Sequence, residues 1–137
     1  MENNPDSDYT LFVKALLKKD LETLNIDAFS QNQKQEIEKC ANIFFERNMI
    51  MESLQTFFLL KQTNKLNELG NLLLKNKQNE FAYEAFKLSK NQENLTKVGE
   101  AFLSNAEIEK AYLAFKLANN AQMIEFIETN FERKFKQ

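Results

Sequence analysis

The sequence predicts an all-α chain built from stacked helical hairpins, and three observations lead to this prediction. The 137 residues include only two glycines and one proline, which leaves little material for tight turns between β-strands. Apolar residues recur at spacings of three and four, as on one face of an α-helix. The pattern also repeats: Tyr83 and Tyr112 lie in matching segments, 112 − 83 = 29 residues apart. A fixed period of this size indicates similar two-helix units stacked in a row.

The charge balance argues against nucleic acid and membrane partners. With 18 basic and 20 acidic residues the net charge is −2, which creates no long-range field for a polyanion. No run of 18 apolar residues occurs, and the opening residues lack the basic and apolar regions of a secretory signal. We therefore expect a soluble, cytoplasmic protein that binds neither nucleic acid nor membrane, with residues 1–7 disordered.

Residue types suited to catalysis are scarce. The chain has no histidine, so it lacks the common general base near neutral pH and the usual nitrogen ligand for zinc. Cys40 is the single cysteine and cannot form an internal disulfide, which favours a reducing compartment. It lies within the apolar period, so we expect a small buried residue rather than a reactive thiol. The sequence therefore predicts no enzyme activity, no metal site and no cofactor.

Residues 8–30 are expected to form an N-terminal helical cap. This segment matches the repeat poorly, as terminal units often do. Its apolar residues at helical spacing are Leu11, Phe12, Ala15 and Leu16. At its end, Ser30 and Gln33 have the spacing of a capping box, which predicts a helix start just before Ile37.

Residues 31–137 are expected to form one domain of helical repeats. The predicted units are repeats over about 35–63, 64–92 and 93–121, followed by a final helix over 121–135. Matching residues in the first helices of the last two repeats are Leu66, Leu69, Gly70 and Leu73 with Leu95, Val98, Gly99 and Phe102. Helices this short are marginal alone in water, so their stability must come from packing against neighbours.

Small residues recur where two helices of a hairpin must approach closely. Gly70 and Gly99 occupy matching positions in the first helix, and the alanines of the second helix are Ala82, Ala85, Ala111 and Ala114. Because glycine inside a helix costs about 1 kcal/mol relative to alanine, we expect contacts there that leave no room for a side chain. In the connectors 75–79 and 90–94, asparagine is expected to end one helix in the left-handed conformation and to cap the next.

The order Leu-x-x-Leu-Gly-x-x-Leu, then Ala and a Phe four residues later, resembles the tetratricopeptide repeat, a helix-turn-helix unit of 34 residues. The residues that carry it are Leu66, Leu69, Gly70, Leu73, Ala82 and Phe86, and the resemblance covers about two thirds of the chain, from Ile37 to Phe131. The shorter period and the missing proline after the second helix are similar to the short hairpins of coatomer-type and intraflagellar-transport-type α-solenoids.

This resemblance implies a right-handed α-solenoid of about three repeats, whose concave groove is lined by the first helix of each hairpin and binds protein segments. The groove residues carried over are Asn42, Asn64, Asn67, Asn71, Thr96 and Glu100. Asparagine amides along one helix could hydrogen-bond an extended peptide backbone. Alternatively, the asparagine row reflects only the asparagine-rich composition. Lys97 is the one basic residue near this face in the last two repeats, which disfavours binding of a terminal carboxylate.

The C-terminal helix suggests a second surface. Apolar residues spread around it beyond one stripe, and the predicted docking end consists of Met123, Phe126 and Phe135. A capping helix normally has a polar outer face, so this end predicts self-association or a larger partner. The alternative is an ordinary amphipathic cap with additional aromatic residues.

The leading functional prediction is a non-catalytic protein-protein interaction scaffold. It would bind a protein segment in the groove or dock through its C-terminal end. A second prediction is a structural subunit or a fragment of a larger α-solenoid. A nucleic-acid-binding helical repeat is less favoured, because Lys87 and Lys116 repeat but Phe58 holds the equivalent earlier position.

Overall fold

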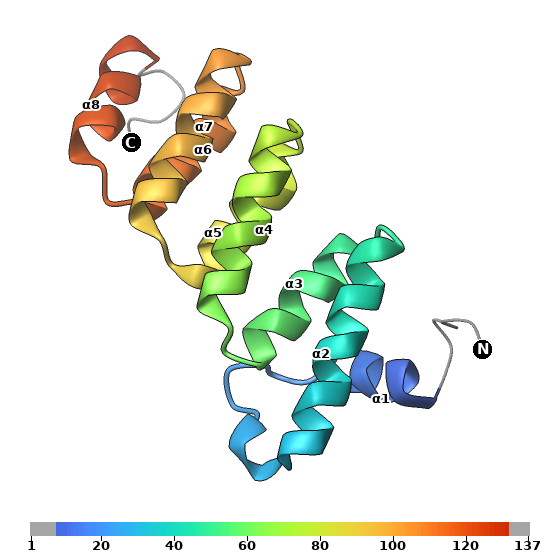
Figure 1. Cartoon of the computed structure of the whole chain (residues 1–137). Helices are drawn as coiled ribbons and strands as arrows, with labels where there is room; N and C mark the ends of the chain where they lie inside the picture. The colour runs from blue at the N-terminus through green and yellow to red at the C-terminus, as the bar shows by residue number, and fades with distance from the viewer. Residues whose placement is uncertain (1–7, 132–137) are drawn as a thin grey trace. The chain divides into compact units, whose positions relative to one another are not determined.

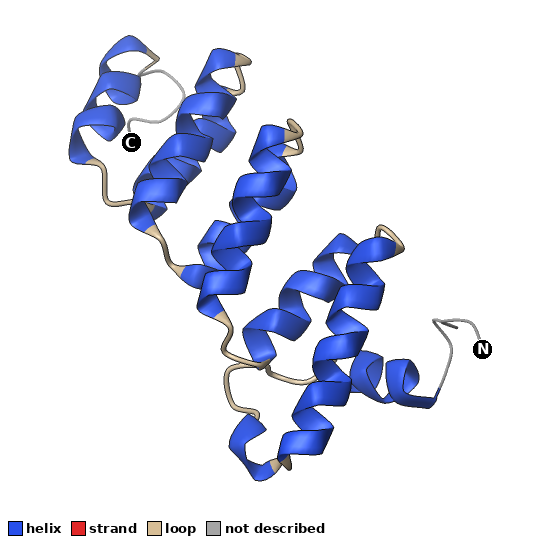
Figure 2. Ribbon diagram, in the orientation of Figure 1, coloured by secondary structure: helices blue, strands red, loops and turns tan. Residues whose placement is uncertain are grey.

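The computed structural model describes residues 8–131, and all regular structure in this range is helical (Figures 1 and 2). The helices are α1 (Asp8–Leu16), a 3-10 turn η1 (Ile26–Ala28), α2 (Gln31–Glu46), α3 (Ile50–Leu59), α4 (Thr63–Lys75), α5 (Asn79–Ser89), α6 (Gln92–Ser104), α7 (Ile108–Leu117) and α8 (Ala121–Asn130). The all-α prediction is therefore confirmed for these residues. The expected disorder of residues 1–7 falls outside the described range.

The chain divides into two compact units, the first ending at Leu66 and the second beginning at Asn67. The division falls inside α4, at a point that no change of composition marks in the sequence. The expected cap over 8–30 and repeat domain over 31–137 stay predictions.

The first unit packs α1, η1 and α3 around α2. Its buried core consists of Val13, Ile26, Ile37, Cys40, Phe44 and Leu59. The predicted capping box starts α2: Ser30 Oγ accepts from the Gln33 amide at 3.1 Å, and Gln33 Oε1 accepts from the Ser30 amide at 2.8 Å. Across the α2–α3 hairpin, the buried Ser53 hydroxyl donates to the Ala41 carbonyl at 2.9 Å. This bond satisfies a polar group that burial would otherwise penalise.

The buried face of α1 differs from the expected one. Leu11 and Phe12 are exposed, at 50% and 41%, whereas Val13 is fully buried. The face that packs on the core carries Tyr9, Val13, Leu16 and Leu17. Because α1 has apolar residues on several sides, spacing alone did not single out the stripe that α2 covers.

In the second unit, α6 packs against α5 and α7, and α7 packs against α8. The same kind of contact occurs in two hairpins: a phenylalanine ring lies directly on a helical glycine. A Cβ added to Gly70 would lie 2.4 Å from Cε1 of Phe86, and one added to Gly99 would lie 2.7 Å from Cε1 of Phe115. Both rings are fully buried. The predicted close approach at the two glycines is confirmed.

Among residues 8–131, six left-handed residues follow the ends of six helices, and none of them is glycine. They are Asn48, Lys61, Lys77, Lys90, Ala106 and Asn119. Within the hairpins, successive positions differ by 77 − 48 = 29 and 106 − 77 = 29 residues. At each one, the amide of the next residue donates a hydrogen bond to a carbonyl in the last turn of the helix. For example, the Glu107 amide donates to the Phe102 carbonyl at 2.9 Å.

The connectors follow the expectation only in part. In 75–79 and 90–94 the left-handed residues are Lys77 and Lys90, so the prediction that asparagine takes this conformation there is wrong. The capping role is confirmed in the second connector, because Asn91 accepts from the Asn94 amide at 2.9 Å. The chain thus places lysine where a left-handed residue is needed, and keeps Asn91 for the helix start.

The final helix is shorter than expected. Ala121–Asn130 is helical, and Phe131 leaves the helix with φ −132° and ψ 37°. The expected end at residue 135 lies outside the described residues. Asn120 starts the helix by accepting from the Met123 amide at 3.1 Å.

The ring contact at Gly99 predicts that Gly99→Ala destabilises the protein, although this substitution usually stabilises a helix. At an open helical site, Gly→Ala stabilises by about 1 kcal/mol. Because a Cβ at Gly99 meets the Phe115 ring, we expect Gly99→Ala to lower the free energy of unfolding by about 1–3 kcal/mol, measured by urea denaturation followed by circular dichroism.

A double-mutant cycle with Phe115→Leu provides the control for this substitution. If the ring is the obstacle, the double variant loses less stability than the two single variants together. A stabilising Gly99→Ala would contradict the contact.

Ala106 provides a prediction in the opposite direction. An L-residue in the left-handed region is strained by about 1–2 kcal/mol, and Ala106 has φ 61°. Glycine removes this strain but loses more entropy on folding, so we expect Ala106→Gly to stabilise by about 0.5–1 kcal/mol. The control is Ala101→Gly within α6, which should destabilise by about 1 kcal/mol. Equal signs for the two variants in urea denaturation would contradict the prediction.

Candidate functional site

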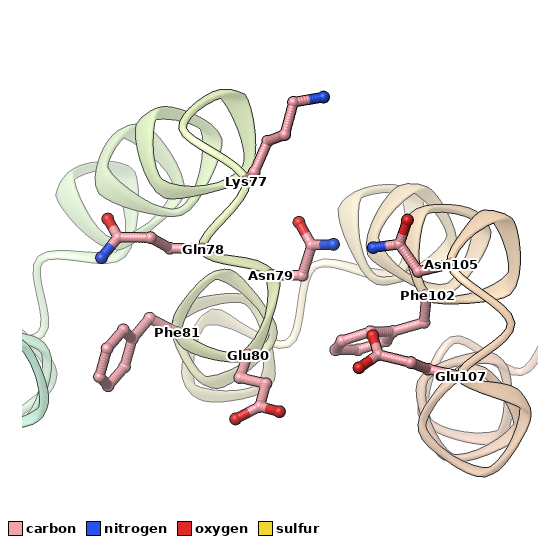
Figure 3. Close-up of a pocket in the computed structure, with 8 residues that line it drawn as sticks. All are labelled: Lys77, Gln78, Asn79, Glu80, Phe81, Phe102, Asn105 and Glu107. Atoms are coloured by element: carbon pink, nitrogen blue, oxygen red, sulfur yellow. The ribbon is translucent and has the colours of Figure 1, made fainter.

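An open cleft of about 310 Å³ lies in the second unit, beside the N-terminal ends of α5 and α7. Its lining residues are Lys77, Gln78, Asn79, Glu80, Phe81, Phe102, Asn105 and Glu107. Figure 3 shows the side chains of Asn79 and Asn105 pointing toward one another, with Phe102 below them in this view. We call this feature the amide cleft.

The connectors place the two asparagines. Asn79 is the first residue of α5, two positions after the left-handed Lys77. Asn105 follows α6 and directly precedes the left-handed Ala106. Neither side-chain amide makes a hydrogen bond to another residue in the described part of the chain. Both amides therefore keep their donors and acceptors available at the opening of the cleft.

At the rim of the cleft, carboxylates pair with an ammonium group. The Lys110 ammonium on α7 donates to the Glu80 carboxylate on α5, and it lies 3.5 Å from Glu107 Oε2. The hydrogen bond to Glu80 is the main cause that raises the pKa of Lys110, with the nearby Glu107 carboxylate adding to it. One ammonium thus contacts both carboxylates.

The repeated tyrosines have matching neighbours. The Lys87 ammonium lies 5.4 Å from the centre of the Tyr83 ring, and the Lys116 ammonium lies 5.5 Å from that of Tyr112. The Tyr83 ring also meets Phe102 edge to face, with centroids 6.2 Å apart. Lys87 and Lys116 therefore each make a cation–π contact with a tyrosine of their own chain.

Most predicted groove residues bond within the chain. Asn67 Oδ1 accepts from the Ser89 hydroxyl at 2.7 Å, and Asn71 Nδ2 donates to the Asn67 carbonyl at 3.0 Å. Thr96 Oγ1 accepts from Asn120 Nδ2 at 3.3 Å.

The other groove residues are more open. Asn42 Nδ2 donates to its own helix, at the Glu38 carbonyl 3.3 Å away, while Asn64 and Glu100 are exposed. Asn42 and Asn64 belong to the first unit and the other four residues to the second. The groove assignment stays a prediction, and three of its four asparagines bond within the chain, unlike those of the amide cleft.

At the predicted docking end, Phe126 is 46% exposed and Met123 is half-buried. Ile127 is fully buried, and Phe131 is 39% exposed. Phe135, the third predicted residue of this end, lies outside the described residues.

Groups suited to metal or thiol chemistry do not gather in the described residues. Between residues 8 and 131, no three His, Cys, Asp or Glu side chains come together in a way that could hold a metal ion. Cys40 is 3% exposed. Its burial, with a smaller contribution from the Glu36 carboxylate, raises the pKa of the thiol to about 11.

The raised pKa predicts slow alkylation of Cys40. At pH 8 the thiolate fraction falls from about one quarter for a free thiol of pKa about 8.5 to about one in a thousand at pKa about 11. We expect the native protein to react with iodoacetamide at least about a hundredfold more slowly than the urea-unfolded chain. Native and unfolded rates within tenfold of one another would contradict the buried placement.

Comparison with known proteins does not assign a family. No protein-family model, curated protein or solved structure matches the chain. Among the helices of residues 8–131, none combines the length and the apolar character needed to cross a membrane.

Proposed function

We propose that this chain is a non-catalytic scaffold that binds an extended segment of another protein. The observation that supports this function is the pair of unpartnered amides, Asn79 and Asn105, facing one another across a cleft of about 310 Å³. An asparagine amide has both donors and an acceptor, so the pair matches the alternating groups of a peptide backbone. The carboxylates of Glu80 and Glu107 outnumber the Lys110 ammonium between them, which suits such a ligand better than a nucleic acid, whose phosphates they would repel.

We further propose that the helices form a short, right-handed α-solenoid of about three 29-residue repeats. The recurrence of left-handed residues and of the glycine-phenylalanine contacts supports this architecture. Its resemblance to tetratricopeptide-like repeats favours protein segments as partners. The predicted first-helix groove would be a second surface of the same scaffold.

A structural subunit, or a fragment of a longer helical repeat, is the second candidate. Exposed apolar residues on and just after α8 favour it. Phe126 lies on α8, and Phe131, which follows the helix, occupies the position of the buried Phe102 one repeat later. In a longer solenoid a following helix would cover that ring.

Affinity capture from native lysate tests the scaffold function. Three baits are compared: the full chain, the cleft variant Asn79→Ala/Asn105→Ala, and the groove variant Asn67→Ala/Asn71→Ala/Glu100→Ala. We expect a protein captured by the full chain and lost with the cleft variant, because the substitutions remove the amide groups without disturbing buried residues. Circular dichroism checks the fold of each bait.

The two variants also separate the two surfaces. Loss with the groove variant alone would move the site to the predicted groove. Capture of the same proteins by all three baits would contradict both surfaces as binding sites.

A further inference from the structure

A second cavity of about 180 Å³ adjoins the amide cleft. Its lining residues are Glu80, Tyr83, Glu84, Phe102, Lys110 and Leu113. Glu80 and Phe102 line both cavities, so the two cavities lie side by side in the second unit. We call this second feature the leucine pocket, after Leu113.

The walls of the leucine pocket are largely apolar. Phe102 is buried, Tyr83 is half-buried against it, and Leu113 is 55% exposed on α7. Small-molecule sites usually occupy about 300–1,000 Å³, so a cavity of about 180 Å³ suits one side chain rather than a whole cofactor. An aliphatic side chain would remove the exposed part of Leu113 from water.

The acidic residues of the pocket are paired with lysines of the chain. Glu80 bonds with Lys110, and Glu84 Oε1 lies 3.2 Å from the Lys87 ammonium. These four groups carry two negative and two positive charges, so they offer a charged ligand group no unpaired partner of opposite sign. Charge complementarity therefore favours an uncharged side chain in this pocket.

We propose that the two cavities together bind one extended, uncharged peptide segment with an aliphatic anchor residue. The aliphatic side chain enters the leucine pocket between Tyr83 and Leu113, and the neighbouring peptide groups hydrogen-bond to Asn79 and Asn105. This site lies mainly on the second helices and the connectors of the hairpins, with Phe102 contributed by α6, whereas the predicted groove lies on the first helices. The inference rests on the proposed scaffold function and specifies its site and ligand class.

Selection from a displayed library of random linear peptides tests the inference on the full chain. We expect the enriched sequences to share one aliphatic residue flanked by uncharged residues. Synthetic peptides of that sequence are then titrated by fluorescence polarisation. Because no charge is neutralised on binding, Kd should change less than about twofold between low and high salt.

Leu113→Asp is the decisive variant, since it places a carboxylate at the mouth of the pocket on an exposed position. We expect it to weaken the selected peptides by about tenfold or more, as substitution of a central anchor contact does. The cleft variant Asn79→Ala/Asn105→Ala should also weaken them. The matched control is Leu72→Asp, because Leu72 is 43% exposed on α4 and lines neither cavity. The control should leave Kd unchanged.

Several outcomes would overturn the inference. Equal affinity for the full chain and Leu113→Asp would place the peptide elsewhere. Enrichment of charged peptides with strongly salt-dependent Kd would exclude the neutral ligand class. If no peptide is enriched, the inference fails, while lysate capture still judges the scaffold function. Peptides lost only with the groove variant would keep that function and reject this site.

Discussion

The packing of a phenylalanine ring on a helical glycine is the contact on which the second unit depends. Phe86 lies on Gly70 and Phe115 lies on Gly99, each with no space for even one methyl group. The contact brings the two helix backbones close, and the rings fill the space at the density of a protein interior. The helix propensity lost at glycine is offset by the complete burial of an aromatic side chain.

The connectors satisfy a second constraint, because short links between antiparallel helices need a residue with positive φ. Glycine usually supplies it, yet this chain uses lysine, asparagine and alanine at all six such positions. The strain is tolerated because the residue after each left-handed residue donates a backbone hydrogen bond back to the last turn of the helix. It also fixes the direction in which the chain continues, and so places Asn79 and Asn105 at the same edge of the unit.

The proposed function rests on the groups that the helices leave available at that edge. The carboxylates near the cleft are paired with lysines, and the one thiol is buried in the first unit. The groups still open to a ligand are the amides of Asn79 and Asn105, the half-buried ring of Tyr83 and the exposed side chain of Leu113. These groups can hydrogen-bond peptide groups and contact apolar surface, which fits the proposed interaction module.

Several features could be predicted from the sequence, because they depend on local spacing. Helical structure, the Ser30 capping box, the close approach at Gly70 and Gly99, and the buried Cys40 all follow from patterns within a few turns of chain. The 29-residue period extended this local information to equivalent positions, such as the two tyrosine-lysine pairs.

Only the tertiary structure showed which side of α1 is buried and that Asn67 bonds to Ser89 rather than remaining open. The amide cleft was also missed, because Asn79 and Asn105 lie 105 − 79 = 26 residues apart and so do not occupy the same position of the 29-residue repeat. Their proximity arises from the packing of α5 beside α6 and from the left-handed turns at Lys77 and Ala106, and the sequence does not mark either as bringing two asparagines together. Local spacing therefore determined the helices, while the packing between them determined the candidate site.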